Sequence, residues 1–195
     1  MSAQPQPYYT LEEYLALERA AEYKSEYLDG EIFAMSGASE RHNDIVTNIV
    51  WQIRSAFRGR PCRVWGNDMR VRVTTAGLYT YPDVVVVCGA REFADDQRDT
   101  LLNPTVIFEI LSPSTEGYDR GKKFAHYARL PSLTDYVLVA QEEVRVEHFQ
   151  RQGDSWLLTA FTSLDETLGL ASLASDLPLN LIYENVEFSP ASPSQ

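Results

Sequence analysis

The sequence predicts an α/β fold in which helices flank a mixed central β-sheet. Apolar runs that end in turn residues alternate with segments of helical periodicity, as in a layered α/β domain. Two runs, 81–87 and 104–112, are apolar on both alternate faces, which is typical of central strands covered on both sides. The length of 195 residues predicts one domain, which we place at residues 9–188.

The elements of the first half follow from local signals. Residues 1–8 are polar and proline-rich and predict a disordered arm. A helix begins after Thr10, because Glu13 completes a capping box. Residues 25–35 predict a hairpin around the turn Asp29-Gly30. Ser39 is the expected cap of a longer helix with apolar residues at helical spacing, which Gly59 ends.

The second half predicts more strands around one further helix. We expect a strand over 64–73 and a turn over 74–78, then the two central strands. A helix is expected over 119–129, and a closing helix or an irregular segment over 177–186. The remaining expected strands are 136–140, 144–150 and 156–161. Residues 189–195 are rich in Pro and Ser and predict a flexible tail.

Composition restricts the function classes. A net charge of −11 argues against a surface that broadly coats nucleic acid, although a local basic groove is compatible with it. Arginines do gather in one stretch, and either form such a groove or simply solvate a helix and an edge strand: Arg54, Arg58, Arg60, Arg63, Arg70 and Arg72.

The two cysteines, Cys62 and Cys88, have no spacing typical of a zinc site or a disulfide framework. We therefore expect Cys88 to be a small core residue at the end of a Val-rich strand. The N-terminus has no signal-peptide pattern, and no stretch is long and apolar enough to span a membrane. These features predict a cytoplasmic protein with no membrane partner.

Two carboxylates interrupt the central strands. Asp83 stands at the head of the first, and Glu109 lies inside the second. The segment 89–103 between them is short and contains no convincing helix, so the strands are expected to pair antiparallel. That pairing brings Asp83 beside Glu109. Two converging carboxylates at a sheet end predict a site for a hard cation, Mg²⁺ or Mn²⁺.

At these residues the sequence resembles a known group, the Uma-two family within the PD-(D/E)XK restriction-endonuclease-like superfamily of nucleases. The resemblance runs from about residue 11 to about residue 151. Its motifs are Glu26–Glu31, Met35–Ser39 with His42, Tyr81–Val87, Phe108–Thr115, Tyr118–Lys123, and Leu130–Leu133 with Tyr136.

The resemblance implies a restriction-endonuclease-like fold and a metal-dependent phosphodiesterase site. Asp83, Glu109 and the backbone carbonyl of Ile110 would hold the metal. A lysine two residues after the glutamate is usual, but this chain has Leu111 there. Lys123, on the following helix, matches the role best, and its neighbour Lys122 is a candidate contact for nucleic acid.

Two further residues are candidates. Glu26 on the hairpin is a candidate extra metal ligand; the alternative is a solvent-facing strand residue paired with a lysine. His42 could meet a DNA phosphate at a helix N-terminus, or be an ordinary surface histidine. His126 and His148 are interpreted as structural. A serine hydrolase is excluded, since no Gly-x-Ser-x-Gly motif is present.

Three functions stay open from the sequence. The first is a Mg²⁺-dependent endonuclease acting on DNA, which would pair as a homodimer to cut both strands. The second is a non-catalytic nucleic-acid-binding or regulatory protein that keeps the nuclease fold. The third is a structural dimer in which Arg70 or Arg72 pairs with the buried carboxylates.

Overall fold

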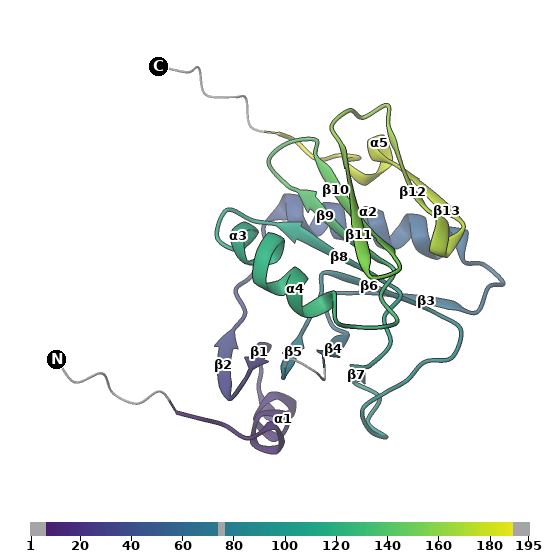
Figure 1. Ribbon diagram of the computed structural model, residues 1–195. Coiled ribbons are helices and arrows are strands. Elements are labelled where there is room, and N and C mark those ends of the chain that lie inside the picture. The colour runs from purple at the N-terminus through teal and green to yellow at the C-terminus, as the bar shows by residue number, and fades with distance from the viewer. Residues whose placement is uncertain (1–6, 74–76, 189–195) are drawn as a thin grey trace, which may run out of the picture.

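The computed structural model describes residues 7–73 and 77–188 and contains two larger β-sheets, a small hairpin and five α-helices within those ranges (Figure 1). Most of the expected N-terminal arm, residues 1–6, lies outside the described residues. So do the expected tail, residues 189–195, and residues 74–76 of the predicted turn.

The larger sheet is six-stranded and mixed, with the order β11-β10-β9-β8-β6-β3. Strands β6 and β8 pair antiparallel, with Val84 opposite Phe108, as the sequence predicts. Strands β8 and β9 pair parallel. The bounds are β3 Cys62–Gly66, β6 Val84–Cys88, β8 Val106–Leu111, β9 Asp135–Ala140, β10 Val146–Gln152 and β11 Ser155–Phe161.

The second sheet has five short strands in the order β2-β1-β5-β4-β7. Its hairpin turns at Asp29 and Gly30, which both have positive φ, so the predicted Asp-Gly turn is confirmed. The bounds are β1 Ser25–Leu28, β2 Glu31–Ala34, β4 Arg70–Val73, β5 Leu78–Thr80 and β7 Thr100–Leu101.

The single strand predicted over 64–73 is wrong. The chain forms β3 in the six-stranded sheet and then β4 in the five-stranded sheet. The break falls at Asn67, whose φ of 57° lies in the left-handed region that asparagine tolerates well. A second passage between the sheets follows β5, where Tyr81 to Asp83 lead into β6. The backbone N–H of Asn67 donates to the carbonyl of Asp83 and ties the two passages together.

Two helices lie in the first half of the chain. The first, α1 Leu11–Ala20, begins with the predicted capping box of Thr10 and Glu13. The second, α2 Glu40–Ala56, is capped by Ser39 and packs its apolar face against the six-stranded sheet. In the described parts of the chain, none of the helices combines the length and the apolar character needed to cross a membrane.

A helical crossover joins the parallel strands β8 and β9, because a parallel pair cannot be closed by a tight turn. It consists of α3 Glu116–Tyr118, a π-helical turn over Asp119–Lys123, and α4 Phe124–Tyr127. It therefore begins before the predicted start at residue 119. Side chains from the crossover pack on the sheet face opposite to α2, against alternate residues of β6 and β8.

The C-terminal part covers the α2 side of the sheet (Figure 1). It forms β12 Thr167–Leu170, a 3₁₀ turn over Ala171–Leu173, β13 Ser175–Pro178 and α5 Leu179–Ile182. Of the two alternatives expected over 177–186, a helix is present, but only over the four residues of α5. The hairpin of β12 and β13 was not predicted, because the sequence interpretation assigned no strand between residues 162 and 176.

Cys62 and Cys88 form a disulfide, so the expectation of a free core cysteine is wrong. The two residues are direct cross-strand partners on β3 and β6. Spacing along the sequence could not reveal the bond, because it depends on which strands pair and in which register.

Candidate functional site

The candidate residues meet in a cavity of about 720 Å³ at the junction of the two sheets. It lies where the chain passes from β5 to β6, beside the N-terminus of α2 and the start of the crossover. The residues that line it include Glu26, His42, Asp83, Glu109, Asp119 and Lys123.

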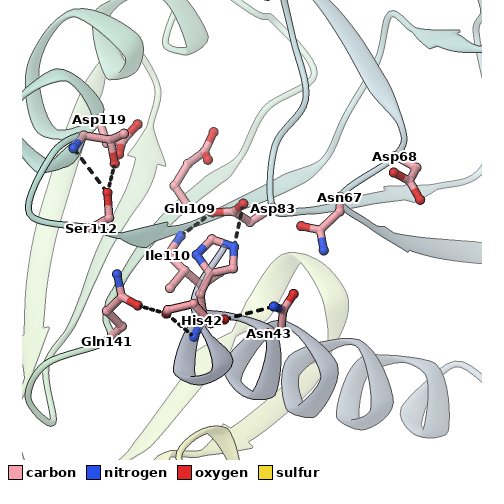
Figure 2. Close-up of polar contacts among 12 residues, drawn as sticks. His42, Asn43, Asn67, Asp68, Asp83, Glu109, Ile110, Ser112, Asp119 and Gln141 are labelled. Carbon is pink, nitrogen blue, oxygen red and sulfur yellow. Dashed lines mark hydrogen bonds and ion pairs between the residues drawn. The ribbon is translucent and has the colours of Figure 1, made fainter. Parts of the chain in front are cut away.

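Two contacts, which Figure 2 shows, fix the carboxylate of Asp83 at the cavity. Its Oδ2 accepts the backbone N–H of Ile110 at 2.7 Å, and its Oδ1 lies 3.1 Å from Nε2 of His42. Because β6 begins only at Val84, the Asp83 carboxylate serves as acceptor for β8 beyond the end of the strand pair. The predicted proximity of Asp83 to the end of β8 is confirmed.

The backbone of Ile110 faces Asp83. In an antiparallel pair, the N–H and C=O of one residue point toward the same neighbour. The N–H of Ile110 points to Asp83, so its carbonyl faces the same side of β8. Ile110 also lines the cavity.

Glu109 is buried on the crossover side of β8. Its Oε1 accepts the hydroxyl of Tyr127 at 2.9 Å and lies 3.1 Å from Nζ of Lys123. Burial raises the pKa of Glu109 well above its ordinary value, against the opposing effect of the Lys123 ammonium. Nearby carboxylates add to the increase, so this group gains from any further positive charge.

Lys123 extends from the π-helical turn into the cavity. Its Nζ lies between Oε1 of Glu109 at 3.1 Å, Oε1 of Glu26 at 3.3 Å and Oδ1 of Asp119 at 3.5 Å. Burial alone would lower the pKa of Lys123, but these three carboxylates outweigh it and raise the pKa well above its ordinary value. The structure thus brings Lys123 beside Glu109, while Leu111 is buried in the apolar core of the crossover side.

Glu26 and Asp119 complete the acidic wall. Glu26 on β1 accepts the Thr80 hydroxyl and faces Lys123, so this candidate is at the site. Asp119 was missed from the sequence, although its position four residues before Lys123 places both on one side of a helical turn. Burial raises the pKa of Asp119, with Lys123 opposing.

His42 is neither a surface histidine nor exposed at the helix end. Its side chain is 13% exposed and contacts Asp83, while its backbone N–H donates to Oγ of Ser39 (Figure 2). The cap therefore fixes the first turn of α2 so that the imidazole reaches the carboxylate. Lys122, in contrast, is exposed and does not line the cavity.

Within the described residues, neither Arg70 nor Arg72 forms an ion pair with the central carboxylates, contrary to the third hypothesis. Arg70 is directed elsewhere. It is buried, forms an ion pair with Asp99 at 3.0 Å, and donates to the Tyr81 hydroxyl and to Thr100. His148 is structural, as expected, since its Nε2 lies 2.6 Å from the buried Asp135.

The cavity is lined by carboxylate oxygens, the donor type that hard divalent cations prefer. Four carboxylates line the cavity, from Glu26, Asp83, Glu109 and Asp119, and Lys123 is the ammonium that contacts three of them. Within residues 7–73 and 77–188, no group of three or more His, Cys, Asp or Glu side chains forms a cage that could hold a metal ion. Mg²⁺ rarely uses such a cage; it binds through one or two carboxylates and completes its shell with water and substrate phosphate.

A family model and two relatives match most of the length of this chain. The family model described as "Uma2: Putative restriction endonuclease" matches residues 11–181. The uncharacterized protein slr1290 of Synechocystis sp. is 35% identical over 94% of this chain and 96% of its own length. The uncharacterized protein sll1609 of the same organism is 38% identical over 77% of this chain and 85% of its own length.

A crystal structure from Anabaena variabilis, described as "a putative nuclease belonging to DUF820", has the same fold. Its TM-score is 0.74 at 23% identity, over 90% of this chain and 97% of that chain. This similarity confirms the predicted restriction-endonuclease-like α/β fold with a mixed central sheet. With the family model matching most of its length, the chain belongs to the Uma2 family.

Proposed function

We propose that this protein is a metal-dependent endonuclease that hydrolyses phosphodiester bonds of DNA with Mg²⁺ or Mn²⁺. One observation carries the proposal: carboxylates from both sheets and from the crossover surround the ammonium group of Lys123 in a 720 Å³ cavity, and Lys24 is the only other ammonium among its lining residues. Such an excess of buried negative charge is costly unless a cation balances it.

Asp83, Glu109 and the carbonyl of Ile110 would hold the metal ion. When bound, the ion supplies a polarised phosphoryl oxygen and a water of lowered pKa. Asp83 is kept in place by the N–H of Ile110 and by His42, so its carboxylate is oriented before any ligand arrives. The hydroxyl of Tyr127 orients Glu109 in the same way.

Lys123 is suited to stabilise charge rather than to accept a proton. Its raised pKa keeps it an ammonium at neutral pH, because three carboxylates surround it. A fixed ammonium beside a phosphoryl group stabilises the negative charge that develops in the transition state. This role would require no strand lysine at position 111.

The proposal is tested by incubating supercoiled plasmid and branched DNA with the protein, with Mg²⁺, Mn²⁺ or EDTA. We expect nicking that needs the metal and is lost in Asp83→Asn. The matched control is Asp96→Asn, which makes the same charge change at an exposed position outside the cavity lining. Absence of cleavage by the wild type, or equal cleavage by Asp83→Asn, would refute the proposal.

A non-catalytic nucleic-acid-binding role is the second candidate. It is favoured by the fact that Lys123 and His42 already contact the carboxylates that a metal would use. Under this alternative, calorimetry would detect no Mn²⁺ binding by the wild type. Mn²⁺ binding that Glu109→Gln weakens would exclude it in favour of the endonuclease.

We also propose that two copies of the chain associate, so that one cavity addresses each strand of a duplex. Sedimentation velocity of the protein with a duplex checks this. A species of two chains per duplex is expected, and a single chain at every concentration would contradict it.

A further inference from the structure

A second pocket, which has no lining residue in common with the carboxylate cavity, lies at the C-terminal end of α2. It has a volume of about 430 Å³ and is lined by the side chains of Arg54, Arg58, Arg60 and Arg63, together with Phe57, Cys62 and Val64. In this chain of net charge −11, such a concentration of guanidinium groups at one concavity is unusual.

These arginines are not neutralised by the chain itself. Within residues 7–73 and 77–188, none of the four forms an ion pair with an acidic side chain. Two are held by other contacts: Arg60 lies over the ring of Phe57, and Arg63 donates to the carbonyl of Cys62 at 2.9 Å. Guanidinium groups fixed in this way are suited to bind the oxygens of a phosphate.

The exposed face of α2 connects this pocket with the carboxylate cavity. From Asn43 to Arg54 the exposed residues of the helix are Asn43, Thr47, Trp51 and Arg54, spaced by three or four positions, and we call these four residues the exposed stripe of α2. Asn43 lines the cavity and Arg54 lines the arginine pocket. At 3.6 residues per turn, the two lie within about 20° of each other around the helix axis.

The stripe has the chemistry of a path for nucleic acid. None of its residues is acidic, and Trp51 is 63% exposed, although a tryptophan is normally buried. An exposed indole offers a surface for a base or a sugar, as aromatic side chains do in many nucleic-acid sites. The stripe is about 16 Å long at 1.5 Å per residue, or about five base pairs of DNA at 3.4 Å each.

We infer that the arginine pocket binds a backbone phosphate of the DNA whose scissile phosphate occupies the carboxylate cavity, with the exposed stripe of α2 between them. The choice of DNA rests on the proposed function. The pocket itself rests on its four arginines and its position on the helix. It would fix the position of the strand without reading bases, because phosphates carry no sequence information.

The test is the affinity for fluorescein-labelled DNA, measured by anisotropy in EDTA, so that no cleavage is needed. The double variant Arg58→Gln/Arg63→Gln is compared with the single variants and with Arg129→Gln. Arg129 is exposed near the end of α4, on the crossover side of the sheet opposite to α2, and gives the same charge change per residue.

We expect the dissociation constant of the double variant to rise roughly tenfold or more, because two charge-assisted contacts are lost. The slope of log K against log salt should become shallower by about 1 to 2.

If Arg129→Gln weakens binding as much as the single variants Arg58→Gln and Arg63→Gln do, only the total charge matters and the inference is overturned. An unchanged affinity in the double variant would also overturn it. Single-stranded and duplex probes of matched length show which form of DNA the stripe prefers. If the double variant cleaves DNA and binds it with unchanged affinity, the phosphate-binding role of the arginine pocket is refuted and the proposed endonuclease function is not. If binding depends on these arginines but the wild type cleaves no DNA, the proposed endonuclease function is refuted and the phosphate-binding role of the pocket is supported.

Discussion

The ammonium nitrogen of Lys123 lies 3.1 Å from Oε1 of Glu109, and the two side chains are only 8% and 4% exposed. Replacing Lys123 by Met removes the cation but leaves Glu109 and Asp119 buried beside the partly buried Glu26. We predict that the free energy of unfolding at pH 7 falls by about 3 to 5 kcal/mol, the usual effect of leaving a buried charge unpaired. Urea denaturation followed by circular dichroism measures it.

The pairing itself is tested by a double-mutant cycle. Glu109→Gln in the Lys123→Met background should recover part of the lost stability, because one of the unbalanced carboxylates is then gone. Lys123→Arg, which keeps the charge, is the control. Strictly additive losses from the two single substitutions would show that the two groups do not interact in solution.

Asp83 supports both the proposed metal site and the end of β8, and two substitutions separate these roles. Asp83→Ala and Asp83→Asn should both weaken Mn²⁺ binding in calorimetry. Only Ala leaves the N–H of Ile110 without its side-chain acceptor, at a cost of about 1 to 3 kcal/mol of stability. If both variants bind Mn²⁺ as the wild type does, the metal site lies elsewhere.

Asp99 gives a prediction for acid stability. Hydrogen bonds from Arg19 lower its pKa to about 2, against the effect of burial. A carboxyl with a lowered pKa in the folded state stabilises the fold above its unfolded pKa, and this stabilisation is lost as the pH falls through the folded value. Asp99→Asn should therefore be less stable than the wild type at pH 7, with the difference shrinking between about pH 4 and pH 2.

Thermal unfolding over that pH range measures the difference, with the exposed Asp96→Asn as the matched control. A constant difference between wild type and Asp99→Asn at every pH would show that the substitution acts through packing and not through the ion pair with Arg19.

The disulfide between Cys62 and Cys88 closes a loop with a sequence separation of 26 residues. Chain-entropy arguments give such a bond about 3 kcal/mol of stabilisation. Dithiothreitol should therefore lower the urea midpoint of the wild type and leave Cys62→Ala/Cys88→Ala unchanged. A wild type that does not respond to the reductant would mean that the two thiols are not joined in solution.

The sequence was sufficient where chemistry is local or where one pairing decides the geometry. The capping box at Thr10, the Asp-Gly hairpin and the cap at Ser39 each depend on neighbours within a few positions. The proximity of Asp83 to Glu109 followed from one inference, the antiparallel pairing of β6 with β8. The structure also brings Lys123 and Glu26 to the same cavity.

What the sequence did not predict depends on contacts between distant elements. Nothing near His42 indicates that Asp83 is its partner, because the contact requires α2 to lie against the end of β6. Asp119 looks like an ordinary charged residue until the crossover is folded onto β1 and β8. The change of sheet at Asn67 did have a local signal, since Gly66-Asn67-Asp68 is a turn sequence, but the apolar residues on either side favoured one continuous strand.

Leu111 occupies the position at which a lysine would be expected, and it is buried among apolar residues. Under the proposed function the charge lies on the crossover instead, and this strand position is free to add about 2 kcal/mol of apolar burial to the core. With the lysine on the crossover, the glutamate and the lysine also lack the fixed spacing along the chain by which such sites are recognised. Relatives of this kind are therefore better found by searching structures for carboxylates and a lysine that lie close together than by searching sequences for a motif of fixed spacing.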